Sequence, residues 1–328
     1  MKQLIAGLSN QIREAIKIGE NTEFKPTNKT ISAVLVCGLG GSGIGGKIIA
    51  LLLKKELGIP FLCINDYEVP AWVDKNTLVI ASSYSGNTEE TIAAINECNL
   101  RGSEIVVITS GGTLLDMAKA NAWNSYIVPG GEQPRAMLAY SLVQQLYILE
   151  RYNLINASVI TDLKGTPIFI DSNEDDIQSE AMRIAKSFIG KRPIIYAGND
   201  FEGIAVRWRQ QINENAKELC WHHVLPEMSH NELVGWAGGA DNLAPLFLYS
   251  SFNHPRTNHR WKILKETLKK YTSTVLETES KGESKIAQNF FLIHLGDWVS
   301  YFMSEIKNID AVEVDVILHL KSEMAKLK

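Results

Sequence analysis

Hydrophobic residues in the first half of the chain form two kinds of run, which alternate. Short runs rich in β-branched residues are typical of parallel strands buried on both faces, and we predict five, at 31–39, 60–66, 77–83, 104–110 and 124–129. Runs with the spacing of helices separate them, and a long helix is predicted at 134–153, with Pro134 in its first turn. This alternation favours a parallel sheet with helices on both faces.

The same alternation begins again after a polar stretch, 164–176, which we interpret as a connector. Further strands are predicted at 192–200, 219–224, 242–250 and 272–280. Residues 33–50 and 193–210 both read as strand, glycine turn and helix, which predicts two copies of one doubly wound αβα unit. We expect an N-terminal domain at 1–153, which binds phosphate, and a C-terminal domain at 154–328, which supplies catalytic residues.

The composition narrows the classes of partner. A net charge of −4 over 328 residues gives no reason to expect a nucleic acid or an anionic membrane. No apolar run reaches the about 20 residues of a spanning helix. Residues 1–20 carry charges throughout, which predicts an amphipathic helix and not a signal peptide. The four cysteines show no paired spacing, so we expect reduced thiols in a cytoplasmic protein.

Hydroxyl side chains gather in "SSYSGNTEET", residues 82–91, between a predicted strand and a predicted helix. The carboxyl end of a parallel strand is where ligands bind, and a helix N-terminus offers free backbone N–H groups. Ser83, Ser85 and Thr88 add three donors, and Gly86 allows close approach of the backbone, so the stretch predicts a phosphate site. The alternative is a simple capped turn with Thr88 as N-cap, which explains Thr88 but not both serines.

The first strand ends in a second candidate turn, "GLGGSGIGG", residues 38–46. Its glycines satisfy G-x-G-x-x-G, and Asp66 ends the next strand, so a dinucleotide site is one interpretation. Ser42 adds another hydroxyl of the kind that binds phosphate. We therefore favour a single compact phosphate monoester, held by Gly40, Gly41, Ser42 and the hydroxyl-rich turn. That hydroxyl-rich turn is found only in the first half of the chain.

The stretch "SSYSGNTEET" resembles the S-x-S-G-x-T signature of the sugar isomerase (SIS) domain, a doubly wound unit that binds phosphosugars. The resemblance covers nearly the whole chain. "EQPRAML", "INENAKE", "EMSHNELVGW" and "VDVILHLK" are similar, in order, to segments of the bifunctional phosphoglucose/phosphomannose isomerase family. This resemblance implies two SIS domains per chain, a homodimer with shared active sites, and catalysis without a metal. It also implies interconversion of glucose 6-phosphate and mannose 6-phosphate with fructose 6-phosphate through a cis-enediolate.

The resemblance assigns catalytic roles to four residues. Glu214 would carry the proton between C1 and C2, whereas the sequence alone favours a solvated helix glutamate. His230 would open the sugar ring in the active site of the other subunit. Arg135 would bind substrate and stabilise the enediolate; a cation in the first turn of a helix opposes the helix dipole, so helix stability does not explain it. Lys321 would lie near the ring oxygen, although a solvated face of the last helix is the plainer interpretation.

The same residues bear on other possible functions. His222, His223, His254 and His259 lack a cysteine or carboxylate set at metal-ligand spacing, so we expect no metal, and proton transfer itself needs no cofactor. A phosphosugar sensor that binds without turnover is an alternative, but such proteins usually carry a DNA-binding segment, for which this chain has no room. An amidotransferase would need a glutaminase domain and an N-terminal cysteine. A dehydrogenase using the glycine-rich turn is the remaining alternative.

Overall fold

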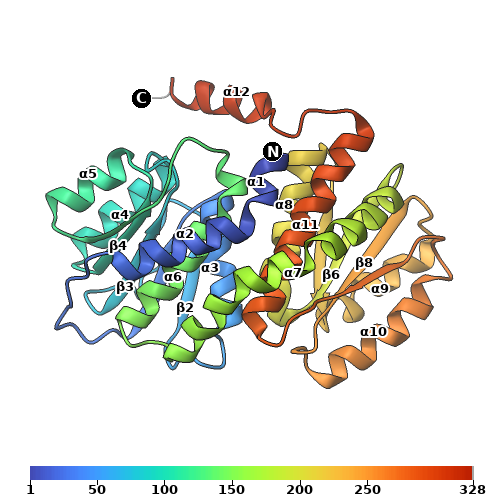
Figure 1. Ribbon diagram of the computed structural model, residues 1–328, viewed down its shortest axis with the longest axis horizontal. Coiled ribbons are helices and arrows are strands. Elements are labelled where there is room, and N and C mark those ends of the chain that lie inside the picture. Colours follow the sequence, from blue (N-terminus) through green and yellow to red (C-terminus); the bar gives the residue numbers. More distant parts are fainter. Residues whose placement is uncertain (327–328) are drawn as a thin grey trace.

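The computed structural model describes residues 1–326, which form two parallel sheets flanked by helices (Figure 1). The first sheet has the strand order β2-β1-β3-β4-β5 and the second has the order β7-β6-β8-β9. The first comprises β1 (Ala33–Cys37), β2 (Phe61–Ile64), β3 (Thr77–Ser82), β4 (Glu104–Thr109) and β5 (Asn124–Ile127). The second comprises β6 (Arg192–Gly198), β7 (Trp221–Leu225), β8 (Leu243–Tyr249) and β9 (Leu276–Glu279). The predicted α/β class with two doubly wound units is confirmed.

The central strands are continuous apolar runs because helices cover both faces of each sheet. All five residues of β1 are buried, and the parallel register pairs Val36 with Ile80 of β3. In both sheets the chain passes to one neighbour of the first strand and then crosses to its other side, so β6, β7, β8 and β9 correspond to β1, β2, β3 and β4. The turn that follows a strand of the second sheet therefore lies at the same position in its domain as the turn that follows the matching strand of the first sheet.

The helices that flank the first sheet are α2 (Leu8–Asn21), α3 (Gly40–Leu52), α4 (Glu89–Leu100), α5 (Gly112–Ala120) and α6 (Leu138–Arg151). The predicted N-terminal helix breaks at Gly7 into α1 (Lys2–Ala6) and α2. The helix predicted from residue 134 instead opens with a 3-10 turn, Pro134–Ala136, and α6 follows it. Arg135 therefore lies in this turn and not in the α-helix, which separates its side chain from the dipole of α6.

The prediction of a connector at 164–176 is wrong. These residues lie inside α7 (Ala157–Phe188), a continuous helix that includes Pro167. Val159, Leu163, Ile170 and Ile177 are buried at helical spacing, so the polar residues between them occupy the outer face. Figure 1 shows α7 running across the front of the molecule, from the first sheet to the second.

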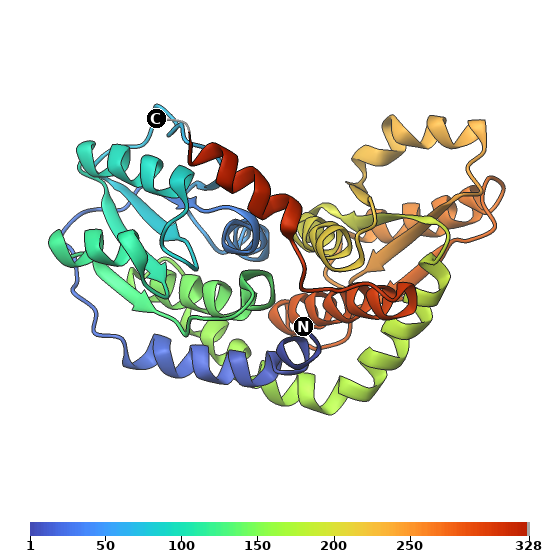
Figure 2. The same ribbon diagram turned by 90° about the horizontal axis from the view of Figure 1, so that it is seen from above.

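The second sheet is flanked by α8 (Glu202–Ala216), α9 (Glu232–Gly235), α10 (Pro255–Leu268) and α11 (Lys285–Lys307). The two halves meet where α3 crosses α8, and in Figure 2 these helices are seen nearly end-on beside each other, in blue and yellow. The crossing needs glycine, because a Cβ on Gly203 would lie only 3.0 Å from the backbone of Ile48. This close contact brings the carboxyl edge of the first sheet next to the end of α8.

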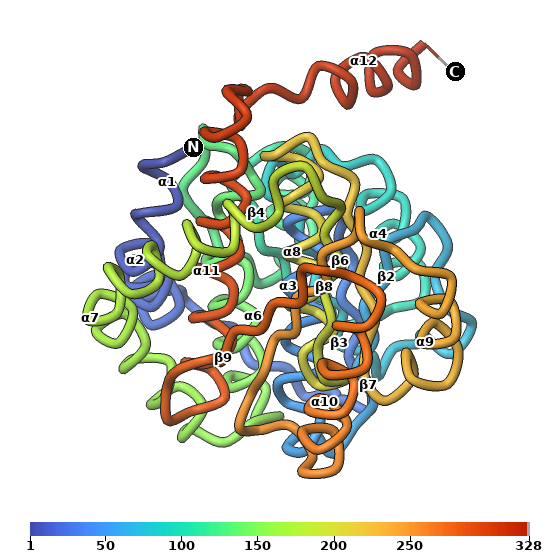
Figure 3. The backbone as a smooth tube through the Cα atoms, turned by 90° about the vertical axis from the view of Figure 1, so that its right-hand side faces the viewer, coloured from blue at the N-terminus to red at the C-terminus, as the bar shows by residue number. Residues whose placement is uncertain are grey.

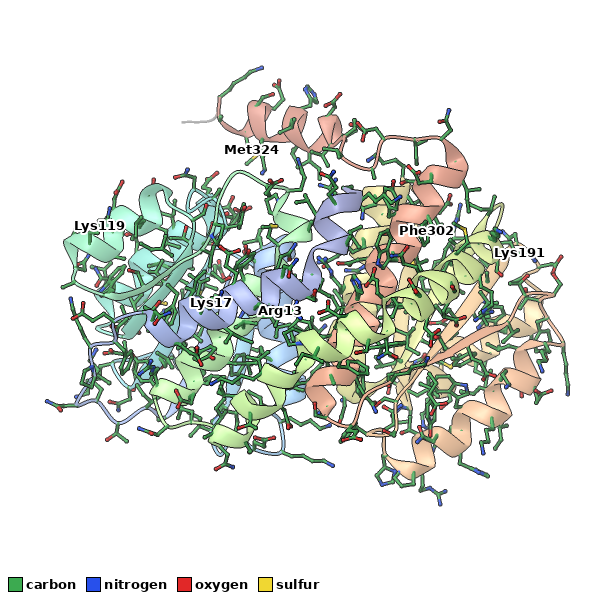
Figure 4. All side chains as sticks on the ribbon, in the orientation of Figure 1. Arg13, Lys17, Lys119, Lys191, Phe302 and Met324 are labelled. Atoms are coloured by element: carbon green, nitrogen blue, oxygen red, sulfur yellow. The ribbon has the colours of Figure 1, made fainter. Side chains whose placement is uncertain are left out.

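The last helix, α12 (Asp315–Met324), has no buried residue over its ten positions. It stands apart from the body of the chain, as Figure 3 shows from the side. The side chains of α12, including that of the labelled Met324, project from this separate helix in Figure 4. In residues 1–326 no helix is both long and apolar enough to cross a membrane.

Candidate active site

The hydroxyl-rich turn forms a hydrogen-bonded loop between β3 and α4. The hydroxyls of Ser83 and Thr88 lie 2.8 Å apart, and the Gly86 N–H donates to the Ser83 Oγ at 3.2 Å. Thr88 occupies the N-cap position of α4, but its side chain caps no N–H of the helix. The plain capped turn considered from the sequence therefore lacks its defining bond. Gly86 has φ +70°, and a Cβ there would lie 1.8 Å from the Gly111 carbonyl oxygen, so the turn requires glycine.

The glycine-rich turn at the start of α3 packs directly against this loop. Ser42 joins the two turns, because its Oγ accepts a bond from the Tyr84 N–H at 3.1 Å and its carbonyl oxygen accepts one from the Ser82 hydroxyl. Ser85 is exposed, and its Oγ accepts a bond from the Asn87 N–H at 3.3 Å. The predicted phosphate-binding residues of the two turns are thus gathered at one edge of the first sheet.

Arg135 lies beside these turns and is 5% exposed. A Cβ on Gly41 would be 3.1 Å from the Pro134 carbonyl oxygen, so the start of α3 touches the 3-10 turn that carries Arg135. The guanidinium Nε donates to the Asn215 Oδ1 at 2.8 Å, and Nη1 lies 3.7 Å from the Glu214 Oε2. Burial lowers the pKa of Arg135. The nearby carboxylate of Glu214 acts in the opposite direction and raises that pKa, but burial is the larger effect.

Glu214 reaches this point from the other half of the chain, on the last turn of α8, with about a third of its side chain exposed. The end of α8 is held by Lys217, whose Nζ donates to the carbonyl oxygens of Glu214 at 2.7 Å and of Glu313 at 2.6 Å. The loop before α12 contacts Arg135, because the Val312 carbonyl oxygen accepts a bond from Arg135 Nη2 at 3.1 Å. The structure therefore brings Arg135 and Glu214 together, and their catalytic roles stay a prediction.

A buried polar network that the sequence reasoning missed supports Arg135. Asn215 donates from Nδ2 to the Ser300 Oγ of α11 at 2.9 Å. Arg207 donates to the Arg135 carbonyl oxygen and to the Asp297 Oδ2, at 2.5 and 2.8 Å. The ion pair between Arg207 and Asp297 is almost completely buried. One signal was available: Arg207, Gln211 and Asn215 recur every four residues on α8, which marks a polar stripe on a helix face that is otherwise buried.

His230 lies far from these residues within its own chain. It is exposed at the end of a 3-10 turn, Glu227–His230, that follows the carboxyl end of β7. Helix α8 runs back from the carboxyl edge to the amino edge of the same sheet, so Glu214 lies at the opposite edge, about 20 Å away along a 15-residue helix. The structure therefore does not bring His230 and Glu214 of one chain together.

The segment around His230 is anchored by Glu232. Its carboxylate accepts a bond from the buried Tyr196 hydroxyl and lies 2.7 Å from the His223 Nδ1. His222, on the other side of β7, is 15% exposed at its side chain, and burial lowers its pKa to about 4. Both histidines are partly buried.

Lys321 is exposed on α12, and Arg135 and Glu214 find their hydrogen-bond and ion-pair partners in other residues of the described part of the chain. The same helix exposes apolar residues, namely Val316, Ile317, Leu318 and Leu320. Cys37, Cys63, Cys98 and Cys220 are free, as predicted. Within residues 1–326 no three of the side chains of His, Cys, Asp and Glu are grouped as a metal site requires.

Comparison with known proteins shows to which family the chain belongs. Residues 31–152 match the SIS domain, and residues 177–324 match the bacterial phospho-glucose isomerase C-terminal SIS domain. A protein from Caldicellulosiruptor bescii, named bifunctional phosphoglucose/phosphomannose isomerase, is 35% identical over 100% of both chains. The chain belongs to the bifunctional phosphoglucose/phosphomannose isomerase family. The isomerase class predicted from the sequence is confirmed at the level of this family.

Other members of the family, and a neighbour outside it, are also similar. A bifunctional phosphoglucose/phosphomannose isomerase from Aquifex aeolicus is 34% identical over 89% of this chain and 90% of its own length. A protein from Sulfolobus acidocaldarius named D-glucosamine-6-phosphate 4-epimerase is 37% identical, over 63% of this chain and 65% of its own length.

Solved structures agree on the fold. A hypothetical protein from Thermus thermophilus superimposes with a TM-score of 0.74 at 15% identity, covering 98% of this chain and 90% of its own. The C-terminal domain of glucosamine-fructose-6-phosphate aminotransferase from Francisella tularensis gives a TM-score of 0.74 at 15% identity, with 95% and 98% covered. At these identities the likeness shows a shared pair of SIS-like units.

Proposed function

We propose that this chain interconverts glucose 6-phosphate and mannose 6-phosphate with fructose 6-phosphate. The observation that carries the proposal is the approach of Arg135 Nη1 to Glu214 Oε2, 3.7 Å, beside the phosphate turns. A base and a fixed cation from two domains are the two groups that proton transfer through an enediolate needs. The names of the full-length relatives support the same activity.

The phosphate of the substrate would bind at the turns of the first sheet. Ser42, Ser83, Ser85 and Thr88 supply hydroxyl donors there, and the N-terminus of α4 supplies free N–H groups and the positive end of its dipole. Backbone N–H groups of Gly40 and Gly41 lie at the start of α3, where a helix N-terminus again favours an anion. Anchoring the phosphate here directs the sugar carbons towards Arg135 and Glu214.

Glu214 acts as the base. Its carboxylate accepts the proton from C2, the electron pair of that C–H bond forms the C1–C2 double bond, and the C1 carbonyl oxygen becomes the enediolate oxygen. The Arg135 guanidinium, fixed by Asn215, stabilises this negative charge. The Glu214 carboxyl then returns its proton to C1, and the proton of the C2 hydroxyl passes to the oxygen on C1, which gives the ketose. Each step moves only protons, so we propose that no metal or cofactor takes part.

Ring opening is assigned to His230 of a second copy of the chain. Because His230 and Glu214 lie at opposite edges of the second sheet, His230 is free to serve a site other than its own. A homodimer also accounts for α12, whose exposed apolar residues would be covered and whose Lys321 would reach the ring oxygen of a bound sugar. The cytoplasmic location stays a prediction.

Complementation between two inactive variants tests the mechanism. Glu214→Gln keeps the shape of the side chain but cannot accept a proton, so it should abolish turnover of both aldoses and leave phosphosugar binding intact. His230→Ala should slow cyclic substrates more than the open forms. Mixed heterodimers would hold one site with both residues intact, so subunit exchange should restore activity, up to about half per heterodimer, because residues that act as one unit fail together.

Controls separate the possible outcomes. Glu266→Gln and His259→Ala change exposed residues of α10 and should leave turnover unchanged. Absence of recovery after demonstrated exchange would refute the shared site. Turnover of glucosamine 6-phosphate at C4, with no turnover of glucose 6-phosphate, would instead place the chain with the epimerase among its relatives.

A further inference from the structure

The second sheet has its own turn at the position of the phosphate loop. β8 corresponds to β3 by its place in the strand order, so the turn between β8 and α10 corresponds to the turn between β3 and α4. The two turns read alike: Ser82–Ser85 is "SSYS" and 250–253 is "SSFN". The first serine anchors each turn, since the Ser250 hydroxyl donates to the Gln288 Oε1 at 2.7 Å. Part of the hydroxyl-rich pattern thus occurs in both halves, which corrects the expectation of a single occurrence.

A cavity of about 440 Å³ opens at this turn, and we call it the second-sheet cavity. The ends of β6 and β7, the turn after β8 and the first turn of α10 all contribute to its wall. Because the chain passes from β6 to β7 on one side and to β8 on the other, the cavity lies at the point where ligands bind in open parallel sheets. Its size lies within the range of small-molecule pockets, about 300–1,000 Å³.

Positive charge without a carboxylate partner lines the second-sheet cavity. Lys55, Arg256 and Arg260 all contribute to its wall, and none has a carboxylate within 4.0 Å in the part of the chain that the structure describes. The one carboxylate in the wall, Asp200, pairs with Lys54 and lies 3.8 Å from the Lys285 Nζ. The negative charge of Asp200 is therefore balanced by these lysines. A group of unpaired cations stands out because the chain as a whole carries a net charge of −4.

A buried polar side chain in the wall also lacks a partner. Asn253 is 6% exposed, and among residues 1–326 nothing hydrogen-bonds to its Nδ2. It occupies the place that Ser85 has in the first turn, and a Cβ on Gly198 would lie 2.1 Å from its Oδ1, so the amide is held against the end of β6. A donor buried without a partner costs about 1–3 kcal/mol, which a ligand that accepts its hydrogen bond would recover.

We propose that the second-sheet cavity binds a phosphate dianion, free or as the ester of a small metabolite, separately from the phosphate of the substrate. The Thr257 hydroxyl, in the first turn of α10, adds a donor to the three cations and to Asn253. A dianion with several acceptor oxygens matches this wall, since it can accept from the amide and neutralise two cations at once. The proposal does not depend on the isomerase reaction.

Calorimetric titration of the full chain with inorganic phosphate tests the proposal, in a buffer without other multivalent anions. We expect two sites per chain. Ser85→Ala should weaken one of them, and the double variant Lys55→Gln/Arg256→Gln should weaken the other by about tenfold or more, because each change removes a charged donor. Both changed residues are exposed, so folding should be retained, and Lys262→Gln on the outer part of α10 is the matched control.

Two further arms complete the experiment. A second titration uses glycerol 3-phosphate in place of inorganic phosphate and distinguishes a phosphate ester from the free ion as the ligand. If glycerol 3-phosphate binds the second site more tightly than inorganic phosphate, the ligand is an ester; if the two bind equally, it is the free ion. The double variant should keep its turnover in phosphate-free buffer. A loss of turnover would mean that these cations serve the isomerase site, and phosphate affinity equal to that of the wild type would show that the cavity binds no phosphate. Either result would overturn the proposal.

Discussion

The buried ion pair of Arg207 and Asp297 allows a quantitative prediction about the support of the active site. Its charged atoms lie 2.8 Å apart, and the side chains are 1% and 8% exposed. Removing one partner of a buried pair leaves a charge without compensation, which costs about 3–5 kcal/mol. Either Arg207→Met or Asp297→Leu should therefore lower the free energy of unfolding by about that amount, a large part of the about 5–15 kcal/mol that stabilises a typical protein.

The double variant gives the sharper test. With both charges gone no buried charge is left unpaired, so Arg207→Met/Asp297→Leu should be less destabilised than the sum of the two single variants. The Gln211 Nε2, which donates to the Asp297 Oδ1 at 2.9 Å, and the Arg135 carbonyl oxygen still lose partners. For that reason we do not expect wild-type stability to return.

The assay is urea unfolding followed by circular dichroism, with thermal unfolding as a second measurement. For 328 residues the unfolding entropy is about 0.7 kcal/mol/K, so each single variant should lower Tm by about 4–7 °C. Glu180→Gln, which breaks the exposed pair with Arg183, is the control and should cost under about 1 kcal/mol. Strictly additive losses in the double variant would refute the reasoning, as would a single variant no worse than the control.

Three further predictions concern the site and its surroundings. Ser85→Ala removes one hydroxyl donor to the phosphate, worth about 1.5–3 kcal/mol, so KM for fructose 6-phosphate should rise about 10- to 160-fold with little change in kcat; an unaltered KM would remove Ser85 from the phosphate site. Activity should survive prolonged chelation, and loss that one divalent ion reverses would contradict a mechanism without metal. Burial keeps His222 neutral in the folded protein and lowers its pKa to about 4. Unfolded chains therefore bind the proton first, and the free energy of unfolding should fall by about 3 kcal/mol between about pH 6.5 and about pH 4, a loss that His222→Gln should reduce. An equal acid sensitivity in that variant would assign the loss to other groups.

Local patterns in the sequence were sufficient for the sheets and the phosphate turns. Strands such as β1 and β3 are apolar along their whole length, and Ser83, Ser85 and Thr88 lie within six residues of one another, so both could be recognised in short windows. The connector prediction failed because Gly165, Pro167 and a cluster of acids outweighed the buried positions of α7, whose helical spacing continues through the proline.

The support of Arg135 could not be predicted in the same way. Its hydrogen-bond partner Asn215 follows 80 residues later, and Arg207 meets Asp297 across a separation of 90 residues. A polar stripe on α8 shows that something polar lies opposite, but only the packing of α8 on α11 shows what it is. The roles of Glu214 and His230 came from the resemblance, since neither residue differs in its local sequence from a solvated side chain.

Helices α7 and α11 limit how this enzyme can move. Apolar residues from both sheets, such as Ile80 and Leu246, belong to one continuous core together with Ile184 of α7 and Phe290 of α11. Hinge bending between the halves would have to break this core, whereas enzymes that close around a substrate bend at a few exposed linker residues. Substrate capture should therefore proceed without rigid-body closure. Any opening of the site should instead involve the loop 308–314, whose Asp310 and Glu313 carbonyl oxygens accept hydrogen bonds from Lys217.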